Sequence, residues 1–267
     1  MAASINTNVA SLNAQRNLST SSSSLQTSMQ RLSSGLRVNS AKDDAAGLAI
    51  AERMDTQTRG MNVAIRNAND AISMAQTAEG ALGAISSNLQ RMRELAVQGA
   101  NGTNTGADLA SLDAEYVLLA AENTRILSST KFNGVSVLAA VSSQFQVGAN
   151  AGDVITVSVG AASQTATTLG STNATASAQL TAIDTDINTM TTIRATWGAS
   201  QNRFEQVIAN LRVGAENSAA ARGRIVDADY AMETANLSRS QILQQAGTAM
   251  VAQANQLPQG VLALLRQ

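Results

Sequence analysis

The sequence predicts a mainly α-helical fold, a long coiled-coil-like bundle or rod with a small β-hairpin, and three observations support it. Apolar residues recur every seven positions over long stretches, which is the pattern of a coiled-coil seam. The chain contains 1 Pro, so almost nothing interrupts long helices. Aromatic residues make up 2% of a chain that is 44% hydrophobic. Because large aromatics dominate burial in thick cores, this composition favours thin layers of packed helices.

The longest predicted helix runs from about residue 44 to about residue 98. Its seam positions fall seven residues apart, and Ile65 and Ile72 fill positions between them. The segment GANGTNTG, residues 99–106, supplies the stop signal. The seam consists of Met54, Met61, Ala68, Ala75, Leu82, Leu89 and Ala96.

Two further helices are predicted from apolar steps of three and four residues. One lies over residues 109–126 and ends before Asn133-Gly134, a dipeptide typical of tight turns. The other spans residues 180–222, and its seam contains Trp197, for which we expect a packing role. The seam residues of these two helices are Leu109, Leu112, Tyr116, Leu119, Asn123 and Ile126, and Leu180, Ile183, Ile187, Met190, Trp197, Phe204, Ile208 and Leu211.

The stretch between these two helices has a different character. Residues 145–160 alternate apolar and polar side chains on both sides of GANAGD, which predicts a β-hairpin. Residues 161–178 are rich in Ser, Thr and Ala and carry no seam. We therefore expect an exposed loop or tip there.

Both ends of the chain carry an apolar stripe at helical spacing, and no third element is available to cover it. An isolated helix of this kind is marginal in water. The stripes are therefore expected to pair as N- and C-terminal helices and then to bury against another molecule. The residues expected to pack there are Leu25, Met29, Leu32, Leu36, Ile242, Ala246, Met250, Leu257, Val261 and Leu264.

Composition excludes several functional classes. The absence of Cys excludes disulfides and thiolate chemistry, and the absence of His removes the commonest general base and metal ligand. We expect no enzymatic activity and no cofactor. The net charge of −1 gives no reason to propose nucleic acid as a partner. No membrane span and no secretory signal peptide are expected.

The segment SAKDDAAGLA, residues 40–49, contains the only motif that could suggest chemistry, the adjacent Asp43 and Asp44. Ser40 and Asp43 have the Ser-x-x-Asp spacing of a helix cap, with both carboxylates in the first helical turn. A salt bridge at an interface is compatible with that role. A catalytic pair would need a partner acid, base or metal ligand, and the sequence offers none.

Long stretches at both ends of the sequence resemble a known protein family. The stretch RLSSGLRVNSAKDDAAGLAIAERM is similar to the N-terminal signature of bacterial flagellin, and ARGRIVDADYAMETANLSRSQILQQAGTAMVAQANQLPQGVLALLRQ is similar to its C-terminus. The resemblance covers roughly residues 1–137 and 180–267. The segment at about 138–179 is variable in that family and very short here, as in a flagellin whose outer domains are absent or minimal.

The resemblance implies a structural subunit that polymerises into the extracellular flagellar filament for swimming motility. Residues 1–43 and 224–267 would form the inner terminal domain, and residues 44–223 the rod, with the hairpin and variable tip. The implied partners are further copies of the chain, the flagellar cap and junction proteins, an export chaperone and the type III export apparatus. The hairpin would be either a supercoiling switch or a passive structural element.

The resemblance also implies contacts with animal immune receptors. Arg91, Leu95 and Glu115 match the stretch gripped by the flagellin-sensing Toll-like receptor; the alternative is a solvated or subunit-facing helix surface. Leu264, Leu265 and Arg266 match the C-terminus read by cytosolic sensors, in the region that docks the chaperone; the alternative is a channel-lining helix. The additional Gln267 departs from that pattern.

Two other functions remain open at the level of sequence. One is a hook–filament junction protein with similar termini, against which the match at both ends argues. The other is a surface glycan-binding protein on the same scaffold. O-linked sugars on the Ser/Thr-rich segment are a further open question.

Overall fold

The computed structural model describes the backbone of residues 7–264 and the side chains of residues 7–256. It confirms a mainly helical fold with a small β region. The helices are α1 (Val9–Ser34), α2 (Ala45–Gly99), α3 (Gly106–Ser129), α4 (Asn173–Val226) and α5 (Tyr230–Leu264). The strands are β1 (Lys131–Phe132), β2 (Val135–Ser136), β3 (Val141–Gln146) and β4 (Val154–Val159).

The chain forms two compact units, and both boundaries fall inside long helices. Unit 1 consists of Met1–Thr56 and Ser218–Gln267, and unit 2 of Gln57–Asn217. Unit 1 therefore contains α1, α5 and the adjoining turns of α2 and α4. The expected boundaries at residues 43 and 224 lie closer to the helix ends than the structural division does.

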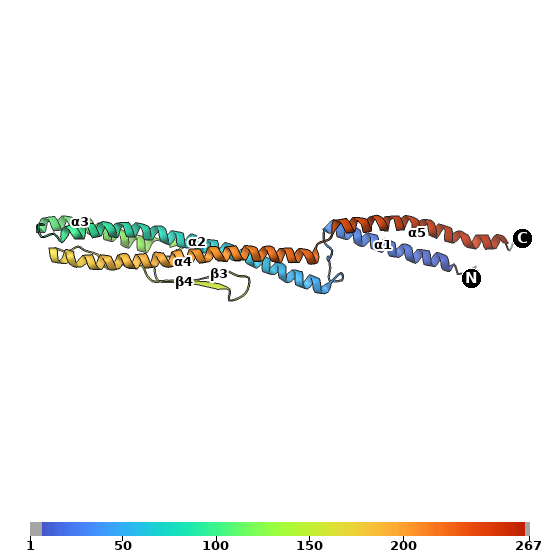
Figure 1. The fold of residues 1–267 in the computed structure, drawn as a ribbon, viewed down its shortest axis with the longest axis horizontal. Helices are drawn as coiled ribbons and strands as arrows, with labels where there is room; N and C mark the ends of the chain where they lie inside the picture. The colour runs from blue at the N-terminus through green and yellow to red at the C-terminus, as the bar shows by residue number, and fades with distance from the viewer. Residues whose placement is uncertain (1–6, 265–267) are drawn as a thin grey trace. The chain divides into compact units, whose positions relative to one another are not determined.

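Unit 2 is built from the long parts of α2 and α4 with α3 beside them (Figure 1). The α2 seam fills its core, and Trp197 of α4 and Tyr116 of α3 are completely buried. The predicted packing role of Trp197 is therefore confirmed. The fully buried α2 seam positions in this unit are Ala68, Ala75, Leu82, Leu89 and Ala96.

The β3–β4 hairpin packs one face against the helices of unit 2. Its strands are antiparallel, with Val141 opposite Val159 and Gln146 opposite Val154. Burial alternates along β4, as expected for a strand with one covered face. Phe145 meets Phe204 of α4 edge to face, with ring centroids 5.4 Å apart. The predicted hairpin is confirmed, although its first strand begins at Val141.

A second, shorter hairpin joins β1 to β2 through Asn133 and Gly134. Both residues have positive φ, 48° and 80°, as a type I′ turn requires. The turn predicted from this dipeptide is therefore present.

The expectation of an exposed loop or tip at residues 161–178 is only partly right, because residues 161–172 form a mostly exposed loop but three of them are buried. Ala162, Ala166 and Leu169 are buried in the core of unit 2. The Ala162 N–H donates to the Leu138 carbonyl over 2.8 Å, and the Leu169 N–H donates to Asp113 Oδ1 over 2.7 Å. The segment packs because carboxylates on two helices accept its backbone N–H groups, a long-range condition that composition cannot reveal.

The last part of that segment belongs to α4, which begins at Asn173 rather than near residue 180. The Thr172 hydroxyl accepts the Thr175 N–H over 3.2 Å, the contact of an N-cap. The Asn173 side chain donates to the carbonyls of Gly99 and Asn101 at the end of α2. These contacts start the helix although the sequence there has no apolar period.

Candidate assembly surface

Helices α1 and α5 form the antiparallel pair of unit 1. At one end, the Asn8 side chain donates to the Ala254 carbonyl over 2.7 Å, and the Ser11 hydroxyl donates to Asn255 Oδ1 over 2.7 Å. At the other end, the Tyr230 hydroxyl lies 3.5 Å from the Leu32 carbonyl. The predicted pairing of the terminal helices is present in this structure.

The chain is also held where α1 ends and α5 begins. Gly35 terminates α1 with φ 72°, and its N–H donates to the Arg31 carbonyl over 2.8 Å. The next residues pair with the segment that precedes α5. Arg37 N–H donates to the Val226 carbonyl over 2.7 Å, and Ala228 N–H donates to the Gly35 carbonyl over 2.9 Å. This pairing fixes the two chain segments beside each other at the base of the helix pair.

The fully buried positions between α1 and α5 are small or polar, with half-buried leucines beside them, and we name this interface the polar seam. Its buried residues are Ser11, Ser28, Glu233, Ser240 and Ala254. At Gly247 the helices approach so closely that a Cβ would lie 3.1 Å from Leu18 Cδ1. Leu25 and Leu32 are half-buried. The polar seam therefore buries little large apolar surface, and its contribution to stability is correspondingly small.

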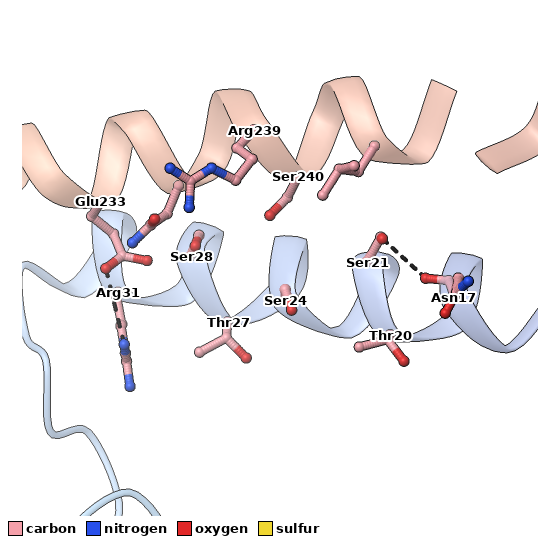
Figure 2. Close-up of a pocket in the computed structure, with 12 residues that line it drawn as sticks. Asn17, Thr20, Ser21, Ser24, Thr27, Ser28, Arg31, Glu233, Arg239 and Ser240 are labelled. Atoms are coloured by element: carbon pink, nitrogen blue, oxygen red, sulfur yellow. Dashed lines mark hydrogen bonds and ion pairs between the residues drawn. The ribbon is translucent and has the colours of Figure 1, made fainter. Parts of the chain in front are cut away.

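A groove of about 650 Å³ runs along the polar seam (Figure 2). Arg31 of α1 and Glu233 of α5 face each other there, with Nη1 and Oε2 4.0 Å apart. The Ser21 hydroxyl donates to the Asn17 carbonyl of its own helix over 3.0 Å. The hydroxyls of Thr20 and Thr27 likewise donate to the carbonyl four residues earlier in α1. The hydrogen bonds of these three hydroxyls therefore lie within α1 and do not join α1 to α5.

Large apolar side chains are exposed on the helix pair, and we name them the outer apolar set; one of them, Leu243, lines the groove itself. The most exposed are Val9 at 69%, Ile242 at 66% and Met250 at 64%. Side chains of this size are normally buried, and a group of them on one helix pair is typical of a surface that another protein covers. The set consists of Val9, Leu12, Met29, Tyr230, Met232, Ile242, Leu243 and Met250.

The predicted packing of the terminal stripes on each other is only partly present within one copy of the chain, where Leu25 and Leu32 are half-buried, and their packing between copies stays a prediction. Met29, Ile242, Ala246 and Met250 are exposed, whereas Leu36 lies beyond α1 and is half-buried beside Asp227. The reason is that small residues occupy the positions where α1 and α5 meet. Periodicity located the stripes but could not show which face the partner helix takes. The side chains of Leu257, Val261, Leu264, Leu265 and Arg266 lie outside the described part of the chain.

The predicted cap at Ser40 is also wrong in its position. Helix α2 begins at Ala45, and Asp44 Oδ1 accepts the Gly47 N–H over 2.8 Å, so Asp44 occupies the capping position. Asp43 closes the preceding turn by accepting the N–H groups of Asn39 and Ser40 and the Ser40 hydroxyl. These hydrogen bonds, chiefly the two from the backbone, lower the pKa of Asp43. The interface salt bridge stays a prediction.

The residues that match the Toll-like receptor contact, Arg91, Leu95 and Glu115, are only partly exposed at the surface. Arg91 Nε donates to Glu115 Oε1 over 2.9 Å, and Nη1 donates to Glu94 Oε2 over 2.9 Å. Both bonds, chiefly that to Glu115, raise the pKa of Arg91. Leu95, by contrast, is 1% exposed and lies inside the core of unit 2. The structure therefore brings Arg91 and Glu115 together at the surface and removes Leu95 from it.

A neighbouring ion pair was not anticipated from the sequence. Arg93 Nε donates to Asp184 Oδ1 over 2.8 Å and so joins α2 to α4. The two residues are far apart in the chain, and no local pattern connects them. Within residues 7–256, no group of three or more Asp, Glu, His or Cys side chains is arranged to hold a metal ion. Among the described helices, none is both long and apolar enough to cross a membrane.

Comparison with known proteins agrees with this architecture. Residues 5–143 match the bacterial flagellin N-terminal helical region, and residues 180–265 match the bacterial flagellin C-terminal helical region. The flagellin of Halalkalibacterium halodurans is 46% identical over 270 residues, covering 98% of this chain and 99% of that protein. The flagellar filament 33 kDa core protein of Treponema phagedenis is 40% identical, with 98% and 99% covered.

A solved structure is similar as well. The crystal structure of Bacillus cereus flagellin superposes with a TM-score of 0.51 at 38% sequence identity, covering 59% of this chain and 94% of that one. The two regions matched by the family descriptions end and begin on either side of residues 144–179, and they include both terminal helices. The chain therefore belongs to the bacterial flagellin family.

Proposed function

We propose that the chain is the structural subunit that polymerises into the bacterial flagellar filament, and that neighbouring copies cover its outer apolar set. One observation carries the second half of this proposal. Unit 1 buries small and polar residues between α1 and α5 and leaves large apolar residues exposed. That arrangement is unfavourable for a helix pair in water and favourable for a pair that is surrounded by others.

The free energy gained by burying this surface favours assembly. Covering one Leu, Ile or Met side chain contributes about 1.5–3 kcal/mol. The outer apolar set contains three large apolar side chains on α1 and five on α5. Ordering a helix pair costs conformational entropy, and in the polymer several neighbouring copies contribute contacts to each pair. We expect the apolar surface buried in all these contacts to contribute more free energy than the ordering costs.

The filament role is favoured over the two alternatives. The relatives that align with nearly the whole chain include proteins called flagellin and a flagellar filament core protein. A junction protein would add to a filament end without elongating it indefinitely. Nothing in the described residues favours a glycan-binding role specifically.

Further partners follow as proposals from the same family membership. As a filament subunit, the chain would act outside the cell, after passage through the type III export apparatus with its chaperone, and would meet the cap and junction proteins. The exposed Arg91–Glu115 pair supports contact with the flagellin-sensing Toll-like receptor. Leu95 could contribute to that contact only if unit 2 opened locally, because its side chain is buried.

The test replaces one member of the outer apolar set. We expect Ile242→Asp to abolish elongation from filament seeds, because a carboxylate would have to lose its water at the interface. Ile242→Val keeps the apolar character and is expected to elongate nearly as well as the parent chain. Sedimentation and electron microscopy measure elongation, and the cooperative melting of the monomer checks that its fold is unchanged.

A substitution on α1 tests the same assembly surface without changing α5. Leu12→Asp on α1 is expected to block elongation in the same way. Normal filament growth by both Asp variants would show that the outer apolar set is not the assembly surface.

A further inference from the structure

We propose that Met29, Met232 and Met250 form an oxidation site, and that their conversion to sulfoxides by a peroxide prevents the free subunit from joining the filament. The proposal rests on the proposed assembly surface, to which all three residues belong. It adds a chemical modification of that surface and a stage at which the modification can take place.

Exposure separates these three methionines from those of the core. Met29, Met232 and Met250 are 56%, 63% and 64% exposed. Met92 and Met190 are 0% and 1% exposed. Met92 is also engaged through its sulfur, which accepts an N–H of Asn123 over 3.6 Å. The same chain thus contains reactive and protected thioethers, and the protected ones provide an internal reference.

The exposed sulfurs lie where neighbouring copies would pack. Met232 and Met250 are separated by about five turns at 3.6 residues per turn, so they lie on the same face of α5. Leu243 is about three turns from Met232 and shares that face. In α1, Met29 precedes Arg31, which lies opposite Glu233, so Met29 is near the Met232 end of the pair. The three thioethers are therefore distributed along the outer apolar set.

The reaction needs only the methionine thioether and a peroxide, and no catalytic group of the protein. A sulfur lone pair attacks one peroxide oxygen, the O–O bond breaks, an S–O bond forms, and the other oxygen leaves as water after proton transfer. Sulfur is oxidised by two electrons, and the peroxide is reduced by two. The product is a polar sulfoxide in place of a flexible apolar thioether, a change that disrupts interfaces containing methionine.

The effect on assembly follows from the cost of desolvation. A sulfoxide oxygen that enters an apolar contact loses its hydrogen bonds to water, and the outer apolar set offers it no matched donor. In the filament, neighbouring copies cover the same sulfurs and exclude the oxidant. Sensitivity is therefore restricted to the free subunit, and incorporation protects it.

The first experiment compares the free chain with filaments of the same chain in hydrogen peroxide. Peptide mass spectrometry measures the sulfoxide at each methionine over time. In the free chain, we expect Met29, Met232 and Met250 to oxidise several-fold faster than Met92 and Met190. In filaments, we expect these three to slow toward the rate of the buried methionines. Equal rates in free chain and filament would overturn the proposal.

The second experiment measures seeded elongation after peroxide treatment. The parent chain is expected to lose elongation, and methionine sulfoxide reductase is expected to restore it. The variant M29L/M232L/M250L keeps side-chain volume, so it is expected to elongate both before and after peroxide. Unchanged elongation of the fully oxidised parent, or loss of elongation by the triple variant only after peroxide, would overturn the proposal.

Two results keep this test separate from that of the assembly surface. Should the triple variant fail to elongate even without peroxide, reversal by the reductase on the parent chain decides the question instead. Failure to reverse would then contradict the proposal. The Ile242→Asp result needs no peroxide, so it reports on the assembly surface alone.

Discussion

At the scale of single residues, Asp186 determines the path of a segment without regular secondary structure. Its carboxylate is 2% exposed and accepts the Thr165 N–H, the Thr165 hydroxyl and the Ala166 N–H over 2.8 to 3.0 Å. Tyr116 lies near it, and burial, together with the charges of Asp186 and Asp113, raises the pKa of that phenol. One carboxylate thus accepts hydrogen bonds from three donors, of which the Ala166 N–H is buried.

We predict that Asp186→Ala lowers the free energy of unfolding by about 2 kcal/mol, because three hydrogen bonds are lost and the Ala166 N–H is left buried without an acceptor. Asp184→Ala is the matched control: its carboxylate is exposed and pairs only with Arg93 at the surface. That change is expected to cost less than about 1 kcal/mol. Urea unfolding measures both, and equal effects of the two substitutions would contradict this account of Asp186.

At the scale of elements, two of the glycines in α2, Gly60 and Gly80, have different surroundings. A Cβ at Gly60 would lie 2.7 Å from Ala149 Cβ and 3.1 Å from Ala149 Cα, in the turn between β3 and β4. A Cβ at Gly80 would meet no atom within 4 Å. The hairpin turn can therefore approach α2 only because Gly60 has no side chain, whereas Gly80 has no such role.

We predict opposite effects of the same substitution at these two positions. Gly80→Ala should stabilise the chain by about 1 kcal/mol, because alanine is the better helix former. Gly60→Ala gains the same helix preference but forces the turn outward, at a cost of about 1–3 kcal/mol that offsets or exceeds the gain. Thermal unfolding of the two variants checks the order, and a Gly60→Ala variant as stable as Gly80→Ala would refute it.

At the scale of the whole molecule, the two units differ in what their interiors contain. Unit 2 buries Trp197, Phe204 and Tyr116 with the α2 seam. The interior of the α1–α5 pair is the polar seam. Because local opening is easiest where little apolar surface is buried, the two units should differ in the free energy of opening.

We predict that backbone amides of α1 and α5 exchange with deuterium faster in the free chain than the central amides of α2 and α4. In filaments the same amides should become protected, since opening would expose the contacts between copies. Hydrogen exchange with mass spectrometry measures both states. Equal protection of all four helices in the free chain would be inconsistent with a weakly held terminal pair.

The long helices, the β3–β4 hairpin, the Asn133-Gly134 turn and the central core could all be predicted from the sequence. Seam positions such as Leu82 and Leu89 repeat every seven residues, and a repeat of that kind is a local property that any reader of the chain can find. The same holds for the alternation along β4 and for the Asn133-Gly134 turn. The position of Trp197 on a seam was sufficient to predict its burial.

Which faces are covered could not be predicted, because it depends on contacts between distant parts of the chain. Leu95 is buried because elements distant in sequence close over it, and residues 161–172 pack because Asp113 and Asp186 accept their N–H groups. The outer apolar set is exposed because small residues fill the positions where α1 meets α5. Periodicity fixes which side chains share a face, but covering that face requires contacts between residues far apart in the chain, and these leave no local pattern.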